Sequence, residues 1–240
     1  MPSSPNAVPD IFFSRPPLPL ARALVGTVLR RRVREGWLAV KIVETEAYAI
    51  EERASHSSLG RTPSREPMFA PAGTIYMYWS RGGPSLNISA LGAGNAVLVK
   101  AGVPYFDKRS PRETLEVMHR LNPTRGGGVR PQHRLCSGQS LLARCLDLKV
   151  AEWSGRSFDP ERFFLEDQGG QPALLQTRRL GIPEGRDEHL PWRFVDRTLS
   201  RSATRNPLTR RNARDGSTYL SIEPGEPTGT FTDPHPPPRR

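Results

Sequence analysis

The sequence predicts an α+β fold in which a mostly antiparallel sheet is flanked by helices. Between residues 26 and 101, short apolar runs rich in β-branched and aromatic side chains alternate with turns that contain Gly or Pro. This pattern is typical of strands joined by hairpins. Helical patterns lie on both sides of this region, at residues 18–25 and after residue 110. At 240 residues, the chain could form one large domain or two small ones.

The first elements follow from local signals. Residues 18–25 form a short helical pattern that Gly26 ends. Residues 28–33 and 38–48 are predicted as two strands joined by a tight turn at Glu35-Gly36, which makes a hairpin.

A long polar loop and three further strands are predicted next. Residues 49–71 are polar and rich in turn-forming residues, and a loop of this length in a compact domain is usually functional. The strands are expected at residues 74–79, 86–90 and 96–101. Tyr76 and Tyr78 share one face of the first of these strands, whereas Trp79 shares the other face with Arg81.

The second half of the chain is predicted to be mainly helical at first. Ser110, Pro111 and Glu113 match a capped helix start, and a second helix is expected from Ser137. Short strands are expected near residues 162–165, 173–177 and 192–195. Arginines recur at every fourth position from Arg193 to Arg205, which indicates either one basic helix face or a solvated tail.

Composition divides the chain into three parts. Residues 1–10 are rich in Pro and Ser and are predicted to be disordered, residues 11–205 form the folded domain, and residues 206–240 form a basic, Pro-rich tail that we also expect to lack order. The two cysteines, Cys136 and Cys145, have no zinc or redox spacing, so we expect them to be buried and reduced. No signal peptide or membrane-spanning run is evident.

The net charge of +11 indicates a polyanionic partner, most often nucleic acid. An arginine-rich composition can also reflect genome composition, so the charge alone does not settle the matter. A basic RNA-binding or ribosome-associated protein is one alternative that the charge leaves open.

A candidate site lies at the end of the strand predicted at residues 38–48. Glu44, Glu46 and Tyr48 alternate along this strand and therefore share one face. Two carboxylates and an aromatic ring at the end of a buried strand are either a solvated acidic strand end or a functional site. The residues themselves do not distinguish Glu44 from Glu46.

Several segments together resemble the alkyladenine (3-methyladenine) DNA glycosylase family. They occur in the order and at close to the spacing of the family and cover about residues 11–201. The matching segments are residues 44–48, 54–56, 60–63, 68–69, 73–78, 86–89, 135–138, 179–182 and 191–194.

The resemblance implies one domain with a curved antiparallel sheet and a protruding hairpin that intercalates into DNA. Such an enzyme flips a damaged purine out of double-stranded DNA and hydrolyses its N-glycosidic bond, without a metal or organic cofactor. It leaves an abasic site and has no lyase activity. The expected substrates are alkylated purines of the 3-methyladenine and 7-methylguanine type.

The resemblance also implies roles for individual residues. Glu46 activates the water, with Glu44 as its structural neighbour, and Tyr48, His56 and Tyr78 sandwich the base. An electron-rich pocket of this kind would attract a cationic base. Without the resemblance, tyrosines on a strand are ordinary core residues and a loop histidine is usually solvated.

Three positions concern specificity and DNA contact. Asn87 matches the residue that obstructs the 2-amino group of guanine, and Lys100 stands where the family usually has Arg. At the hairpin tip the family inserts a Tyr, and the aligned residue here is Arg81. We expect Arg81 to fill the gap left by the flipped nucleotide, with Trp79 as its competitor, although a Trp on a strand more often belongs to the core.

An inactive relative that binds distorted or damaged DNA is the main alternative function. The expected protein is a monomer without membrane contact, located in the cytoplasm of a bacterium or in a eukaryotic nucleus.

Overall fold

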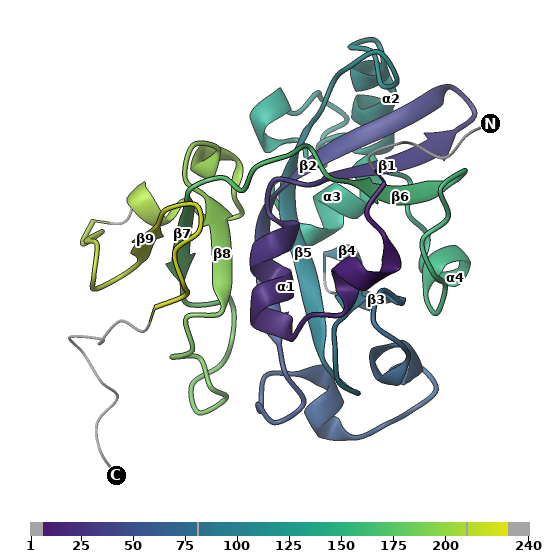
Figure 1. Ribbon diagram of the computed structural model, residues 1–240. Coiled ribbons are helices and arrows are strands. Elements are labelled where there is room, and N and C mark those ends of the chain that lie inside the picture. The colour runs from purple at the N-terminus through teal and green to yellow at the C-terminus, as the bar shows by residue number, and fades with distance from the viewer. Residues whose placement is uncertain (1–6, 81, 210, 230–240) are drawn as a thin grey trace.

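A nine-stranded antiparallel sheet forms the centre of the computed structural model, which describes residues 7–80, 82–209 and 211–229 (Figure 1). The main path of the sheet runs β3-β4-β5-β2-β8-β7-β9, and β1 pairs with β2 and β6. The strands are β1 (Val28–Val33), β2 (Gly36–Tyr48), β3 (Ile75–Ser80), β4 (Gly83–Ser89), β5 (Ala96–Pro104), β6 (Phe163–Glu166), β7 (Leu174–Thr177), β8 (Arg193–Asp196) and β9 (Leu220–Ile222). The helices are α1 (Pro17–Leu24), α2 (Thr114–Leu121), α3 (Gln139–Cys145) and α4 (Val150–Trp153). The α+β prediction is confirmed.

The longest strand, β2, links the two parts of the sheet. Its first half pairs with β1, and residues 44–46 pair with β8 on the same edge, while β5 runs along its other edge. The pairing of β2 with β5 shifts register on both sides of Glu44, which marks a β-bulge where the partner changes. Because a bulge bends and twists a strand, β2 can serve both parts of the sheet.

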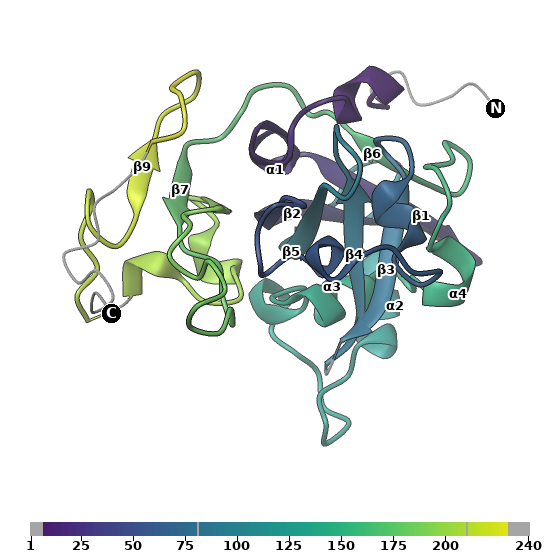
Figure 2. The same ribbon diagram turned by 90° about the horizontal axis from the view of Figure 1, so that it is seen from below.

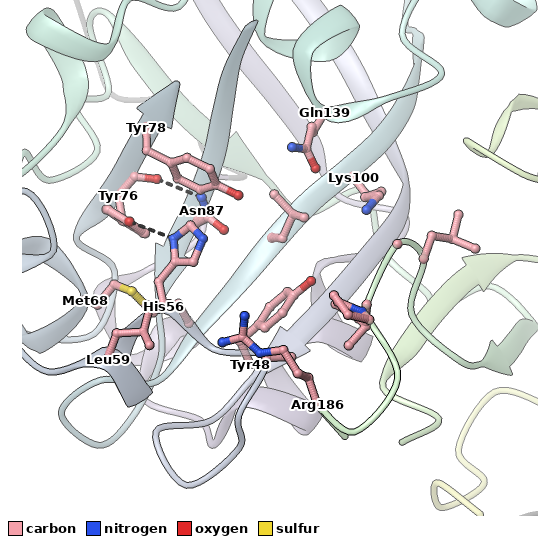
Figure 3. Close-up of a pocket in the computed structure, with 17 residues that line it drawn as sticks. Tyr48, His56, Leu59, Met68, Tyr76, Tyr78, Asn87, Lys100, Gln139 and Arg186 are labelled. Carbon is pink, nitrogen blue, oxygen red and sulfur yellow. Dashed lines mark hydrogen bonds between the residues drawn. The ribbon is translucent and has the colours of Figure 1, made fainter. Parts of the chain in front are cut away.

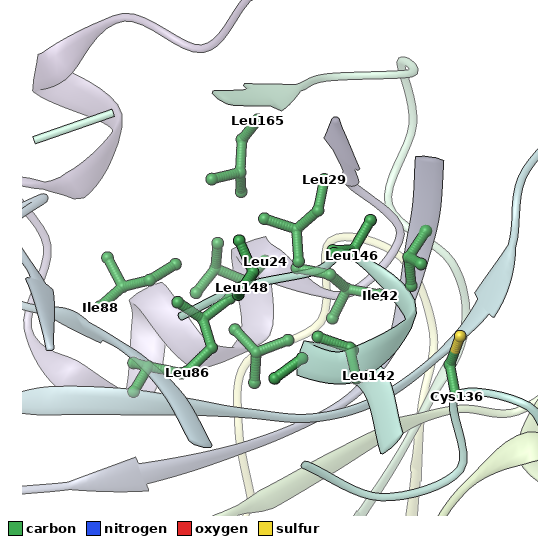
Figure 4. Close-up of a cluster of buried hydrophobic side chains, with 14 of the residues drawn as sticks. Leu24, Leu29, Ile42, Leu86, Ile88, Cys136, Leu142, Leu146, Leu148 and Leu165 are labelled. Carbon is green, nitrogen blue, oxygen red and sulfur yellow. The ribbon is translucent and has the colours of Figure 1, made fainter. Parts of the chain in front are cut away.

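One large apolar core lies between the sheet and the helices (Figure 4). Leu24 of α1, Leu29 of β1, Leu86 of β4 and Leu142 of α3 meet there and are fully buried. Helix α1 ends where the sequence predicts, because Gly26 has a φ of +95°, a conformation that favours glycine.

The hairpin of β3 and β4 lies at one margin of the sheet, and β7 and β9 lie at the other (Figure 2). Ser80 pairs with Gly83 across the hairpin turn, and helix α3 supports this turn from one side. Arg144 Nη2 donates to the carbonyl oxygen of Gly82 at 2.8 Å, and the hydroxyls of Ser80 and Ser140 are 3.3 Å apart.

Two local predictions are wrong. Helix α2 begins at Thr114, because Ser110 is buried and its hydroxyl accepts a hydrogen bond from Arg30 Nη1. The arginines from Arg193 onward do not form a helix face, because Arg193 lies in β8 with its side chain buried.

The segment expected to be a tail contributes to the sheet. Strand β9 pairs with β7, and Ile222 is buried in the main core. An apolar pair of residues, Leu220 and Ile222, is enough to add a short strand to an exposed sheet edge. The prediction for residues 1–6 and 230–240 lies outside the described residues. Within the described part of the chain, no helix has the length and hydropathy needed to cross a bilayer.

Candidate active site

A cavity of about 370 Å³ opens over the ends of β2, β4 and β5 (Figure 3). Five residues singled out by the sequence line it together: Tyr48, His56, Tyr78, Asn87 and Lys100. They come from β2, a loop, β3, β4 and β5, so the sheet and the loop that follows β2 bring them together.

Glu46 lies beside this cavity and is fully buried. Its Oε2 accepts hydrogen bonds from the Tyr48 hydroxyl at 2.9 Å and from Lys100 Nζ at 3.0 Å. Its Oε1 accepts the backbone N–H of Leu180 at 3.0 Å. Since an ionised carboxylate has about four acceptor positions, these three donors leave one for a further ligand.

The partners of Glu46 determine its charge state. Burial alone would raise the pKa of Glu46, but the Lys100 ammonium, the Leu180 N–H and the Arg193 guanidinium outweigh it and hold the pKa below its ordinary value. Burial and the neighbouring Glu46 carboxylate raise the pKa of Tyr48 far above its usual range. At neutral pH the site therefore holds an ionised Glu46 carboxylate and a neutral Tyr48 phenol.

The opposite wall of the cavity is aromatic. The ring centroids of His56 and Tyr78 are 4.6 Å apart, and Tyr76 stacks on Tyr78 with centroids 5.5 Å apart. His56 Nδ1 lies 3.1 Å from the Tyr76 hydroxyl, a contact that the sequence analysis did not foresee. Burial and the positive charges of Arg65 and Arg186 lower the pKa of His56, so the imidazole is neutral at pH 7. Burial beside Tyr78 raises the pKa of Tyr76 to about 12.

Asn87 and Lys100 occupy the inner part of the cavity. Asn87 is 5% exposed, and its Nδ2 donates to the backbone oxygen of Tyr76 at 3.2 Å. The side chain of Lys100 is 11% exposed and also lines a second cavity of about 490 Å³, beside Gln139 and Thr204. Lys100 therefore stands between two open spaces.

Glu44 has a different environment and lines neither cavity. It is fully buried, accepts Arg193 Nε at 2.6 Å and accepts the backbone N–H of Thr204 at 2.6 Å. The sequence places Arg193 in a basic repeat and in the matching segment 191–194, and its pairing with Glu44 depends on β8 lying beside β2. No local signal in the sequence predicts that pairing.

The segment 179–182 also belongs to the site. Leu180, Gly181 and Ile182 line the cavity, and the Leu180 N–H reaches Glu46. In the sequence this segment only contributes to the resemblance, and no local pattern in it indicates a role.

The hairpin tip is described only in part. Arg81, the expected intercalating residue, lies outside the described residues. A Trp on a strand was expected to belong to the core, and for Trp79 this is wrong, because Trp79 is 70% exposed on the edge strand β3. An exposed indole at this position is available for contact with a partner.

Among the described residues, no group of three or more His, Cys, Asp or Glu side chains is placed to hold a metal ion.

Comparisons with known proteins identify the family of the chain. A model of the methylpurine-DNA glycosylase family matches residues 11–199. The chain therefore belongs to the methylpurine-DNA glycosylase family.

Relatives in bacteria and in humans share this similarity. A protein of Pseudomonas savastanoi pv. phaseolicola is 52% identical over 92% of this chain and 99% of its own length, and one of Pseudomonas aeruginosa is 53% identical over 85% of each chain. Both are named "Putative 3-methyladenine DNA glycosylase". The human DNA-3-methyladenine glycosylase is 37% identical over 78% of this chain and 64% of the human protein.

Proposed function

We propose that this protein is a base-excision-repair glycosylase that removes alkylated purines from double-stranded DNA. The observation that carries the proposal is the position of Glu46, a buried ionised carboxylate next to a cavity walled by Tyr48, His56 and Tyr78. The family and the names of the relatives favour 3-methyladenine and similar bases as substrates. A flipped purine would enter the cavity and stack between these rings.

In the proposed reaction a water adds to C1′ while the N-glycosidic bond breaks and the base leaves with the bonding electrons. The transition state has oxocarbenium character, so the negative charge of Glu46 stabilises the developing positive charge at C1′. Glu46 also accepts a proton from the water. A carboxylate with a lowered pKa is a weak base, but a strongly electrophilic sugar needs little activation of the nucleophile.

Water must reach a carboxylate that is fully covered in the DNA-free protein. We propose that Lys100 moves away from Glu46 when DNA binds, since its side chain borders the 490 Å³ cavity, which offers it space. We further propose that the enzyme hydrolyses the bond without lyase activity, as the resemblance to the family implies.

A strand-break assay tests the function. The protein is incubated with a duplex that contains 3-methyladenine or 7-methylguanine, and hot alkali then cleaves any abasic sites. Alkali-dependent breaks are expected, and breaks that form without alkali would indicate a lyase. A protein that binds the lesion tightly but produces no breaks would be the inactive DNA-binding relative. A hypoxanthine duplex run in parallel extends the test to a neutral base.

The hairpin tip is the proposed site of DNA insertion. The sequence favours Arg81, and the exposure of Trp79 adds a second side chain that can stack on bases. Binding of Arg81→Ala and Trp79→Ala to a duplex with an abasic site separates the two. Weaker binding by Arg81→Ala alone supports the guanidinium as the inserted group, whereas weaker binding by Trp79→Ala alone assigns insertion to the indole.

A further inference from the structure

Arg179 is a buried arginine that connects three segments around the candidate site. Both of its terminal nitrogens pair with the carboxylate of Glu52, and Nη1 also donates to the backbone oxygen of Ala47 at 2.9 Å. Nη2 donates to the backbone oxygen of Asp187 at 3.2 Å. The side chain of Arg179 has no exposed surface, so these contacts are made in the interior.

The guanidinium of Arg179 also covers the ring of Tyr48. Its carbon atom lies 4.7 Å from the ring centroid, which is within the range of a cation–π contact. Tyr48 lines the cavity but Arg179 does not. Arg179 therefore packs on the Tyr48 ring from outside the cavity, which limits the movement of Tyr48.

The next residue in the chain reaches the carboxylate. The N–H of Leu180 donates to Glu46 Oε1, while the Tyr48 hydroxyl donates to Oε2. Arg179 and Leu180 are bonded to one another, so fixing the Arg179 side chain also fixes the position of the Leu180 N–H. The hydrogen bonds that Glu46 accepts from the Leu180 N–H and from the Tyr48 hydroxyl therefore both depend on Arg179.

We propose that Arg179 is a positioning residue for base release, which acts by holding Tyr48 and the Leu180 N–H against Glu46. This inference rests on the proposed function and assigns a role to the segment 179–182 that neither the resemblance nor the cavity alone provides. Arg179 does not touch the substrate, so its effect on the reaction passes through Tyr48 and Glu46.

A positioning role predicts a change in the pH dependence of the reaction. Lys100 of β5, Arg193 of β8, Tyr48 of the same strand and Tyr78 of β3 are the charged and titratable groups near Glu46. The Leu180 N–H is the second of the contacts that lower the pKa of Glu46, after Lys100. If this N–H moves away, the pKa of Glu46 rises. The acid limb, which is the part of the pH–rate profile where protonation of Glu46 slows base release, then moves to higher pH.

The test compares two buried arginines that have similar partners. Arg179→Gln removes the ion pair with Glu52 beside the site. Arg30→Gln removes a buried arginine that pairs with Glu166 and Asp107 and does not line the cavity. Both variants are expected to lose stability, so stability does not distinguish positioning from a purely structural role.

The distinguishing readout is the single-turnover rate of base release as a function of pH. For Arg179→Gln we expect a rate roughly 10- to 100-fold lower and an acid limb about one pH unit higher, with lesion binding changed far less. For Arg30→Gln we expect the acid limb of the parent. Identical acid limbs for Arg179→Gln and the parent would overturn the proposal.

A second variant covers the case in which Arg179→Gln does not fold. Glu52→Gln keeps the shape of the partner but weakens the hold on Arg179, and its acid limb should shift in the same direction. An unshifted limb would also overturn the proposal. Failure of the proposed function is a separate result, because the parent itself would then release no base.

Discussion

Glu44 and Glu46 lie two residues apart on β2 and are both fully buried, but their surroundings differ. Glu44 is held by Arg193, which is 2% exposed and lines neither cavity, and by the backbone N–H of Thr204. Glu46 is held by Lys100, which borders two cavities, and one of its acceptor positions is left for a further ligand.

The comparison shows what separates a structural carboxylate from a chemically available one. A rigid guanidinium that is itself buried fixes the carboxylate permanently, which suits the junction of β2 and β8. A flexible ammonium beside open space can leave, which suits a carboxylate that must meet water. The two carboxylates are equally buried. The mobility of the paired cation, Arg193 or Lys100, therefore decides which carboxylate can meet water.

The largest expected difference is in activity. Glu46→Gln should slow base release by about 10² to 10⁴-fold while retaining lesion binding, because the amide has the shape but not the charge of the carboxylate. Glu44→Gln should slow it by less than about tenfold, because the side-chain partner of Glu44 is Arg193, which does not line the cavity, whereas Glu46 is bound to the cavity residues Tyr48 and Lys100. Single-turnover assays on the same methylated duplex measure both rates. A variant Glu46→Gln that keeps parental turnover would refute the proposed mechanism.

The second expected difference is in stability. Here Glu44→Gln, and not Glu46→Gln, should have the larger effect. Glu44→Gln removes the carboxylate with which the buried Arg193 forms its ion pair and should lower the free energy of unfolding by about 3 kcal/mol. Glu46→Gln should cost only about 1 kcal/mol, because Lys100 can turn into the adjoining cavity and become hydrated. Urea denaturation of the two variants measures the difference.

A double variant provides the control for that measurement. Glu44→Leu with Arg193→Met removes both charges of the buried pair and should recover much of the stability lost in Glu44→Gln. If Glu46→Gln is the less stable single variant, the contrast between the two carboxylates is wrong.

The smallest expected effect is in the pH dependence of stability. The pKa of Glu46 is lower in the folded protein than its ordinary value of 4.5, so the folded state binds fewer protons at this site than the unfolded state. The stabilisation is complete above pH 4.5 and is lost as the pH falls through the folded-state pKa. Below pH 4.5 the parent should therefore lose stability more steeply than Glu46→Gln. Equal slopes in urea denaturation between pH 3 and 5 would contradict the lowered pKa.

Much of the fold could be predicted because its signals are local. Gly26 ends α1 with a positive φ, and the hairpin of β1 and β2 forms at the turn before Gly36 as predicted. The predicted helix is present as α2, but its predicted start at Ser110 is wrong, and the Ser110 hydroxyl instead accepts a hydrogen bond from a distant arginine, Arg30. Local propensity gave way to a tertiary contact in that case.

The five residues that line the cavity could be predicted from the sequence because they lie in short motifs. The contacts that these residues make could not be predicted. The Trp79 side chain is exposed because it lies next to the hairpin turn at the end of β3, whereas Met77 on the same face of the strand is 2% exposed. A strand pattern by itself does not reveal where a strand leaves the core. The pairing of His56 with Tyr76 joins a loop to a strand 20 residues away. Residues so far apart in the sequence come into contact only in the folded chain.

The amino-acid sequence alone determined the order of the strands along the chain, the basic charge, and the identities of Glu46, Tyr48 and His56 as candidates. Only the tertiary structure decided which carboxylate adjoins the cavity and which is paired with Arg193. The reason is physical: Glu44 and Glu46 have the same chemistry and the same face of one strand. Their difference comes from β5 and β8 and from the Leu180 N–H, which approach β2 from 54 to 149 residues away.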